Sequence, residues 1–196
     1  MELPIYKLTI RENDPNTGVE FVALVDDPAI KRNYHFFKAE KQLFQIQDEE
    51  KRVVSGPLMV ADMPIFRKAG GKMKTDYYAV FDADTIWQIG QKFFKENKGA
   101  SVNLMHQPDL KVNGVYCFES FFIDSKRGIN TPTGFDTLSD GSWFGSFKVD
   151  NDLVWEEVKA GTFKGFSVEG MFEMEPAETA DEKLMNEVMA ILEQMN

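Results

Sequence analysis

The sequence predicts a mainly β protein with a few helices, an α+β class in which the strands close, or nearly close, a β-barrel. Short β-rich segments recur along the 196 residues, only two or three segments have helical periodicity, and no repeated βαβ alternation occurs. With 43% hydrophobic and 13% aromatic residues, the chain can bury one sizeable core and a small appendage. We therefore expect a barrel domain at residues 1–175, followed by a linker and an amphipathic helix at 176–196.

Most of the expected elements are strands. Ile5–Arg11 alternates apolar and polar residues, turn residues follow at 14–18, and Val19–Val25 is a second β-rich run, so these two segments predict a hairpin. The other expected strands are Arg52–Val60, Tyr77–Phe81, Ser101–His106, Val115–Ile123, Trp143–Val149 and Phe166–Met174, with weaker extended stretches at Tyr34–Phe37 and Gln42–Gln47.

Three segments have the spacing and capping residues of helices. Asp82 or Asp84 can cap a helix that runs to about Asn97, because apolar residues recur on one face of that segment. A shorter helix is expected at 151–161. A capping-box pattern begins at Thr179 and precedes the amphipathic C-terminal helix, which could dock on the body or on another subunit.

Charge and cysteine content exclude several classes of partner. The chain has 32 acidic and 22 basic residues, a net charge of -10, which repels nucleic-acid phosphates and anionic lipid surfaces. No apolar stretch long enough to span a membrane and no signal-peptide pattern occurs, so we expect a soluble protein. Cys117 is the single cysteine, which excludes an internal disulfide and indicates a buried small side chain.

Two distant segments indicate the chemistry of a serine hydrolase. Val102–His106 ends in a histidine, and Lys164–Gly170 contains Ser167, so folding could bring a base to a nucleophile. His35 lies in an aromatic segment and is interpreted as a packing residue. Phosphate-loop, dinucleotide, zinc and EF-hand patterns do not occur in the sequence, which therefore predicts no cofactor and no metal site.

Strand parity gives Ser167 and His106 only weak support. Phe166 and Val168 share one face of their strand, while Ser167 and Glu169 share the other, so Ser167 points away from the main apolar core. By parity alone, an ordinary solvent-facing serine is the better explanation. A structural histidine at a strand end explains His106 as well as a catalytic base does.

The carboxylate that would orient the histidine has three candidates. Glu20, Glu119 and Glu169 each interrupt an apolar pattern within an expected strand. A buried carboxylate needs a partner, and lysine or arginine would serve as well as an imidazolium. The residue patterns do not rank the three.

Four segments carry a resemblance to a known family: Val53–Val60, Val102–His106, Gly114–Tyr116 with Glu119-Ser120, and Lys164–Gly170. In order and spacing they resemble the XkdF-type phage serine proteases, over about residues 53–174. That family is related to the prohead, or capsid maturation, proteases, so the resemblance implies the herpesvirus assemblin-like fold, a closed β-barrel surrounded by a few helices.

The resemblance also nominates the site residues. His106 and Ser167 match two of the prohead-protease motifs, and the third motif resembles Glu20–Ala29 at the N-terminus, which implies a circular permutation and nominates Glu20 as the third catalytic residue. Gln107 replaces the usual acid after the histidine, and Ala23 replaces a serine. Both departures leave room for a degenerate enzyme.

The function implied by the resemblance is a serine endopeptidase of the phage prohead in the bacterial host cytoplasm. Its expected partners are scaffold and capsid precursor proteins, with self-cleavage and homodimerisation also implied. In the expected mechanism Ser167 attacks a peptide carbonyl, His106 transfers the proton and Glu20 orients the imidazole; a turn near Gly145-Ser146 is one guess for the oxyanion site. Two alternatives stay open, a non-catalytic head-assembly module and an unrelated esterase or amidase.

Overall fold

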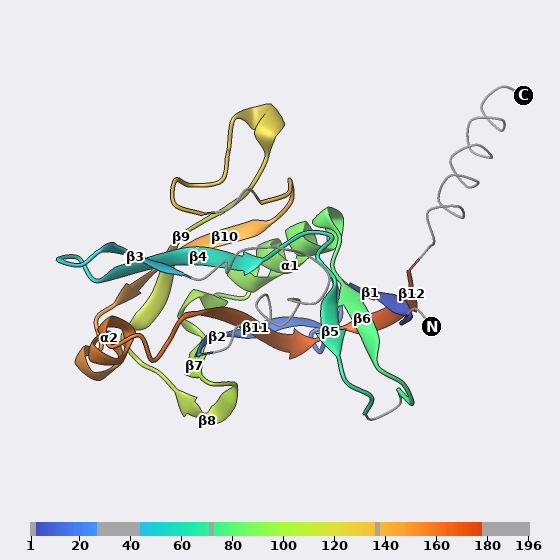
Figure 1. Cartoon of the computed structure of the whole chain (residues 1–196), viewed down its shortest axis with the longest axis horizontal. Helices are drawn as coiled ribbons and strands as arrows, with labels where there is room; N and C mark the ends of the chain where they lie inside the picture. Colours follow the sequence, from blue (N-terminus) through green and yellow to red (C-terminus); the bar gives the residue numbers. More distant parts are fainter. Residues whose placement is uncertain (1–2, 27–43, 71–72, 136–137, 178–196) are drawn as a thin grey trace, which may run out of the picture.

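Three open sheets form the β structure of the described residues, which are 3–26, 44–70, 73–135 and 138–177 of a computed structural model (Figure 1). In the first sheet the strand order is β12 (Glu173–Pro176), β1 (Ile5–Thr9), β6 (Tyr77–Val80), β5 (Ile65–Arg67). In the second it is β3 (Gln45–Asp48), β4 (Val53–Met59), β10 (Trp143–Val149), β9 (Val115–Phe122). In the third it is β11 (Gly165–Met171), β2 (Gly18–Val25), β7 (Val102–Leu104), β8 (Gln107–Lys111).

The predicted closed β-barrel, and with it the assemblin-like architecture, is wrong. A barrel needs one continuous ladder that returns to its first strand. Here the ladders end at the edges of each four-stranded sheet, and the chain itself passes between sheets. The expected strand Phe166–Met174 shows this, because it divides at Phe172 into β11 of the third sheet and β12 of the first.

The predicted hairpin between the first two strands is also wrong. β1 pairs with β12 and β6, whereas β2 pairs with β11 and β7. Lys92 provides a physical reason, since its buried ammonium donates to the backbone carbonyls of Arg11, Asp14 and Thr17, the last at 2.6 Å. The connection between β1 and β2 is thereby attached to a helix instead of joining two paired strands.

Two predicted helices form where their capping residues place them. The Asp82 carboxylate accepts a hydrogen bond from the backbone N–H of Thr85 at 2.9 Å, and the Asn151 side chain accepts one from the N–H of Val154 at 3.1 Å. Neither helix in the described ranges is long and apolar enough to cross a membrane. The helices are α1 (Ala83–Lys95) and α2 (Asp152–Lys159). The predicted C-terminal helix and the extended stretch at 34–37 lie outside the described residues.

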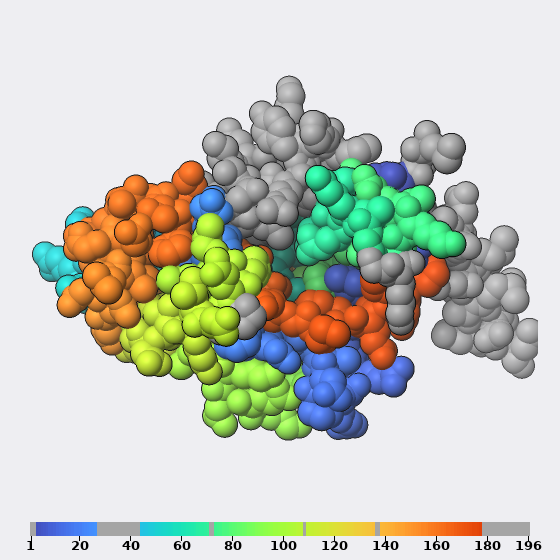
Figure 2. Space-filling model, turned by 90° about the horizontal axis from the view of Figure 1, so that it is seen from below, coloured from blue at the N-terminus to red at the C-terminus, as the bar shows by residue number. Residues whose placement is uncertain are grey.

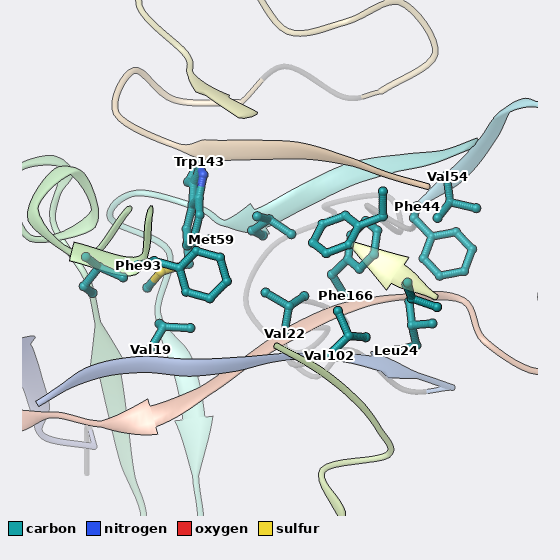
Figure 3. Packing of buried hydrophobic residues seen from close by; sticks show 14 of the residues in the cluster. Val19, Val22, Leu24, Phe44, Val54, Met59, Phe93, Val102, Trp143 and Phe166 are labelled. Carbon is teal, nitrogen blue, oxygen red and sulfur yellow. The ribbon is translucent and has the colours of Figure 1, made fainter. Parts of the chain in front are cut away.

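The main core lies between the second and third sheets and is closed by α1 (Figure 3). Trp143 of β10, Val22 of β2 and Phe93 of α1 are each no more than 1% exposed. The Trp143 ring packs edge-on against Phe93 with 5.5 Å between the ring centroids. Because β2 and β11 each bury one face against this core, the opposite face of the third sheet is held in a fixed position for a site.

Candidate functional site

The candidate site lies on the face of the third sheet that points away from the main core. Ser167 of β11 is in register with Ala23 of β2, which is in register with Asn103 of β7. Neighbouring strands lie about 4.8 Å apart, so the backbones that carry Ser167 and Asn103 are separated by roughly 10 Å. The N-terminal strand β2 therefore lies between the serine strand and the strand that leads to His106.

Ser167 is not the exposed strand serine that parity alone favours. Its neighbour Phe166 is 2% exposed in the core, so the serine side chain points to the other face, as expected. There Ser167 itself is only 7% exposed. No hydrogen bond joins its hydroxyl to His106 in the described part of the chain. Proton transfer between them would need a change of side-chain rotamer or a bound substrate.

His106 belongs to a tight turn and not to the expected strand Ser101–His106. β7 ends at Leu104, β8 begins at Gln107, and the two residues between them, Met105 and His106, have φ angles of 56° and 57°. Two successive left-handed residues are typical of a type I′ hairpin turn. Side chains other than glycine and asparagine adopt this conformation at a cost of about 1–2 kcal/mol each. The fold therefore holds the exposed His106 in a strained position.

The imidazole contacts a carboxylate through one nitrogen, and its other nitrogen has no hydrogen-bond partner in the described part of the structure. His106 Nδ1 lies 3.4 Å from Glu169 Oε2, and the Asn103 side-chain amide donates to the same oxygen at 2.9 Å. A histidine that donates from Nδ1 to a carboxylate keeps Nε2 unprotonated and able to accept a proton. Asn103 is fully buried and donates to the carboxylate, while its own Oδ1 has no hydrogen-bond partner among the residues that the structure describes.

The three candidate carboxylates occupy different places. Glu169 contacts His106, as described above. Glu20 is exposed on β2 beside the bulge at Glu169, and it forms no hydrogen bond or ion pair with the imidazole within the described ranges. Glu119 belongs to the second sheet, where it accepts a hydrogen bond from Ser146 Oγ at 2.6 Å. The role that the resemblance gives to Glu20 stays a prediction.

The expected oxyanion turn near Gly145-Ser146 is wrong. Both residues lie inside β10, which pairs with β4 on one side and with β9 on the other. β10 belongs to the second sheet, whereas Ser167 belongs to the third. Backbone N–H groups that are already paired within a sheet are poor donors for a developing oxyanion.

Comparison with known proteins decides the family. The family described as "Putative phage serine protease XkdF" matches residues 40–175, more than half of the chain. The chain belongs to the XkdF family. The resemblance expected from the sequence is thus confirmed, and the matched range contains Ser167, His106 and Glu169 but not Glu20.

One curated relative of this XkdF-family chain is the phage-like element PBSX protein XkdF of Bacillus subtilis (strain 168). The two sequences are 26% identical over 179 residues, which cover 84% of this chain and 58% of the relative. The chain therefore spans little more than half the length of that protein. No solved structure matches it.

Asn103 is the site residue that sequence reasoning missed. Its signal was present, because an amide between Val102 and Leu104 interrupts an apolar strand in the same way as the candidate glutamates do. A buried amide needs partners for both of its polar atoms. In this XkdF-family fold one partner is the carboxylate that contacts His106.

A substitution at Met105 tests the strained turn. We expect Met105→Asn to stabilise the protein by about 0.5–1 kcal/mol, because asparagine tolerates positive φ better than methionine does. The measurement is the free energy of unfolding in urea. Met174→Asn is the matched control: Met174 is similarly exposed, 39% against 37%, but lies within strand β12, where asparagine is disfavoured. Equal effects of the two changes would contradict the account of the turn.

The reactivity of the Cys117 thiol provides a second test, because its rate of alkylation depends on the pH relative to the pKa of the thiol. Burial raises the pKa of Cys117 from 9.0 to about 12, so the thiol stays protonated well above neutral pH. Because the thiolate is the reactive form, a shift of that size reduces its fraction on the order of 10³-fold at pH 8. We expect iodoacetamide to label Cys117 far more slowly in the folded protein than in urea, as followed by mass spectrometry. Equal labelling rates in the folded protein and in urea would show that the thiol is accessible and that its pKa is not raised.

Proposed function

We propose that this XkdF-family protein is a serine endopeptidase of phage head maturation that cleaves scaffold and capsid precursor proteins. The observation that carries the proposal is the contact of His106 Nδ1 with Glu169, on the sheet face that also presents Ser167. It gives the imidazole the orientation of a general base, with Nε2 as the nitrogen that would accept the proton. The family description supplies the reaction class, and the head-maturation role extends the resemblance found in the sequence.

The proposed reaction has two halves. Ser167 Oγ forms a bond to the substrate carbonyl carbon while His106 Nε2 takes the hydroxyl proton, and the carbonyl oxygen becomes an oxyanion. The C–N bond then breaks, and His106 returns the proton to the leaving amine. Water attacks the acyl-enzyme in the same way and releases Ser167. General base action supplies roughly 10²- to 10⁴-fold in rate.

Cleavage of the cognate precursors tests this proposal. The full chain is incubated with purified scaffold protein and capsid precursor of the same phage, and products are followed by mass spectrometry. We expect discrete fragments, together with covalent labelling of Ser167 by a fluorophosphonate probe that His106→Ala reduces. The heat-denatured chain is the control for contaminating proteases. The absence of both fragments and labelling would overturn the proposal.

Two observations favour a second candidate, a non-catalytic head-assembly module in the same family. In the structure of the described residues, the Ser167 hydroxyl makes no hydrogen bond with His106. In addition, Ala23 lies between their strands at a position where the resemblance leads us to expect serine in a prohead protease. Such a module would bind the scaffold or capsid precursor without cutting it. Binding without cleavage, measured by sedimentation of the mixture, is the result that distinguishes it.

The identity of the orienting carboxylate gives a further prediction. We expect Glu169→Gln to lower kcat/KM for precursor cleavage by about 10- to 100-fold, because the amide orients the imidazole without stabilising its charged form. Glu20→Gln is the matched control, since it removes the same charge from an exposed position on the adjacent strand. A larger loss with Glu20→Gln would assign the role to the residue that the resemblance nominates.

A further inference from the structure

Two side chains share one carboxylate oxygen of Glu169. The side-chain amide of Asn103 donates to Glu169 Oε2 at 2.9 Å, and His106 Nδ1 lies 3.4 Å from the same atom. A carboxylate has two equivalent oxygens and can turn either of them toward a partner. The shorter contact, with the amide, therefore favours the orientation in which Oε2 stays beside the imidazole.

The three side chains differ in how firmly the fold holds them. The side chains of His106 and Glu169 are 43% and 32% exposed, and His106 lies in the turn between β7 and β8. Asn103 is 0% exposed and lies in β7, which pairs with β2 on one side and with β8 on the other. Figure 2 shows the yellow-green chain of β7 and β8 at the surface beside the red-orange chain of β11. The buried amide is thus the anchor of an exposed pair.

The stability of the fold alone does not explain an asparagine at this position. Asn103 interrupts an apolar strand between Val102 and Leu104, and its Oδ1 has no hydrogen-bond partner among the described residues. A buried carbonyl oxygen without a partner destabilises a protein, and an apolar side chain of similar size avoids that cost. The Glu169 carboxylate is partly exposed and can be hydrated without the amide. A residue that breaks the rule for buried positions in this way is typical of a functional site.

We propose that Asn103 is a positioning residue of the reaction: it keeps the Glu169 carboxylate oriented toward His106, and the carboxylate in turn keeps the proton of the neutral imidazole on Nδ1. This inference rests on the proposed function. Nε2 is then the nitrogen that takes the proton of Ser167. Ser167, Ala23 and Asn103 lie in one row across the third sheet, so the amide acts on the same face as the nucleophile, with one strand between them.

Nitrogen NMR of the imidazole tests the positioning without any substrate. The full chain carries isotope-labelled histidine in a His35→Gln background, which leaves His106 as its single histidine. At about pH 9, where histidine is ordinarily neutral, we expect the proton mainly on Nδ1, and Asn103→Leu should lower that share by about twofold or more. Asn113→Leu is the control, because Asn113 is an exposed asparagine between β8 and β9. An unchanged tautomer in folded Asn103→Leu would overturn the inference.

Cleavage kinetics test the same inference in the reaction. We expect Asn103→Leu to lower kcat for precursor cleavage by about tenfold with little change in KM, because the amide acts through the carboxylate and not on the substrate. In a Glu169→Ala background the same change should add less than about a twofold loss, since the group through which Asn103 acts is already absent. The midpoint of urea unfolding should not fall for Asn103→Leu. Asn103→Ala removes the same donor without adding bulk, and it replaces Asn103→Leu if that variant does not fold.

The outcomes separate this inference from the function on which it rests. Losses that multiply in the double variant, or a loss confined to KM, would indicate an ordinary structural role and overturn the inference while the proposed function stands. Ser167-dependent cleavage at the unmodified rate by folded Asn103→Leu would do the same. No Ser167-dependent cleavage of any precursor by the unmodified chain would overturn the proposed function and, with it, the role of Asn103 in the reaction.

Discussion

We expect Ser167→Ala to lower precursor cleavage by at least about 10³-fold while the protein stays folded. Removing the nucleophile of a serine protease leaves only the contributions of substrate binding and oxyanion stabilisation. The change deletes one oxygen from a side chain that is 7% exposed and whose hydroxyl makes no hydrogen bond within the described ranges. The free energy of unfolding should therefore change by less than about 1 kcal/mol.

The control for this experiment is Ser101→Ala. Ser101 is partly exposed and lies directly before β7, so it is close to the site in the sequence without facing Ser167 from a paired strand. Both variants and the unmodified chain are incubated with the same precursors, and initial rates are compared. Cleavage at the unmodified rate by Ser167→Ala would remove this residue from the mechanism, whatever the behaviour of His106.

Elements with local signals could be predicted from the sequence. Asp82 precedes α1 and caps it as expected, and Trp143–Val149 forms a strand with the predicted bounds. In both cases the signal lies within a few residues of the element that it specifies. The resemblance to the XkdF family could also be predicted, because its motifs are short contiguous segments.

The pairing of strands could not be predicted in this way. The turn residues at 14–18 indicate a hairpin, yet Lys92, which is 75 residues from Thr17 in the sequence, attaches that connection to α1. The same limit applies to the barrel, since the alternation of a strand specifies which face is buried but not which strand lies beside it. The predicted mainly β composition was therefore correct, whereas the predicted closure of the strands into a barrel was wrong.

The candidate site was only partly predictable for similar reasons. Ser167 and His106 stand out by residue type, whereas the turn at Met105 contains no glycine or asparagine and so predicts a continued strand. The contact between His106 and Glu169 depends on that turn and on the pairing of three strands. Residue patterns therefore could not rank Glu169 above Glu20 or Glu119 as the carboxylate that contacts the histidine.

A β-bulge lies between Glu169 of β11 and Glu20 of β2, and the second prediction with a large effect concerns Gly170, which belongs to this bulge. The register of β11 against β2 shifts between Glu169 and Gly170. A Cβ atom added at Gly170 would lie 1.9 Å from the carbonyl oxygen of Gly18 and 2.9 Å from Val19 Cα. Both are backbone atoms of the neighbouring strand, so no side-chain movement can relieve the clash.

We expect Gly170→Ala to destabilise the protein by about 3 kcal/mol, at the upper end of the usual cost of overpacking, because β2 and β11 must move apart. Gly70→Ala is the matched control, since the nearest atom to its Cβ lies 4.0 Å away. The free energy of unfolding in urea measures the difference. If the proposed function holds, cleavage by the folded fraction should also fall, because Glu169, which contacts His106, directly precedes the displaced residue. Unchanged stability of Gly170→Ala would mean that the two strands are not held in the register that forms the site.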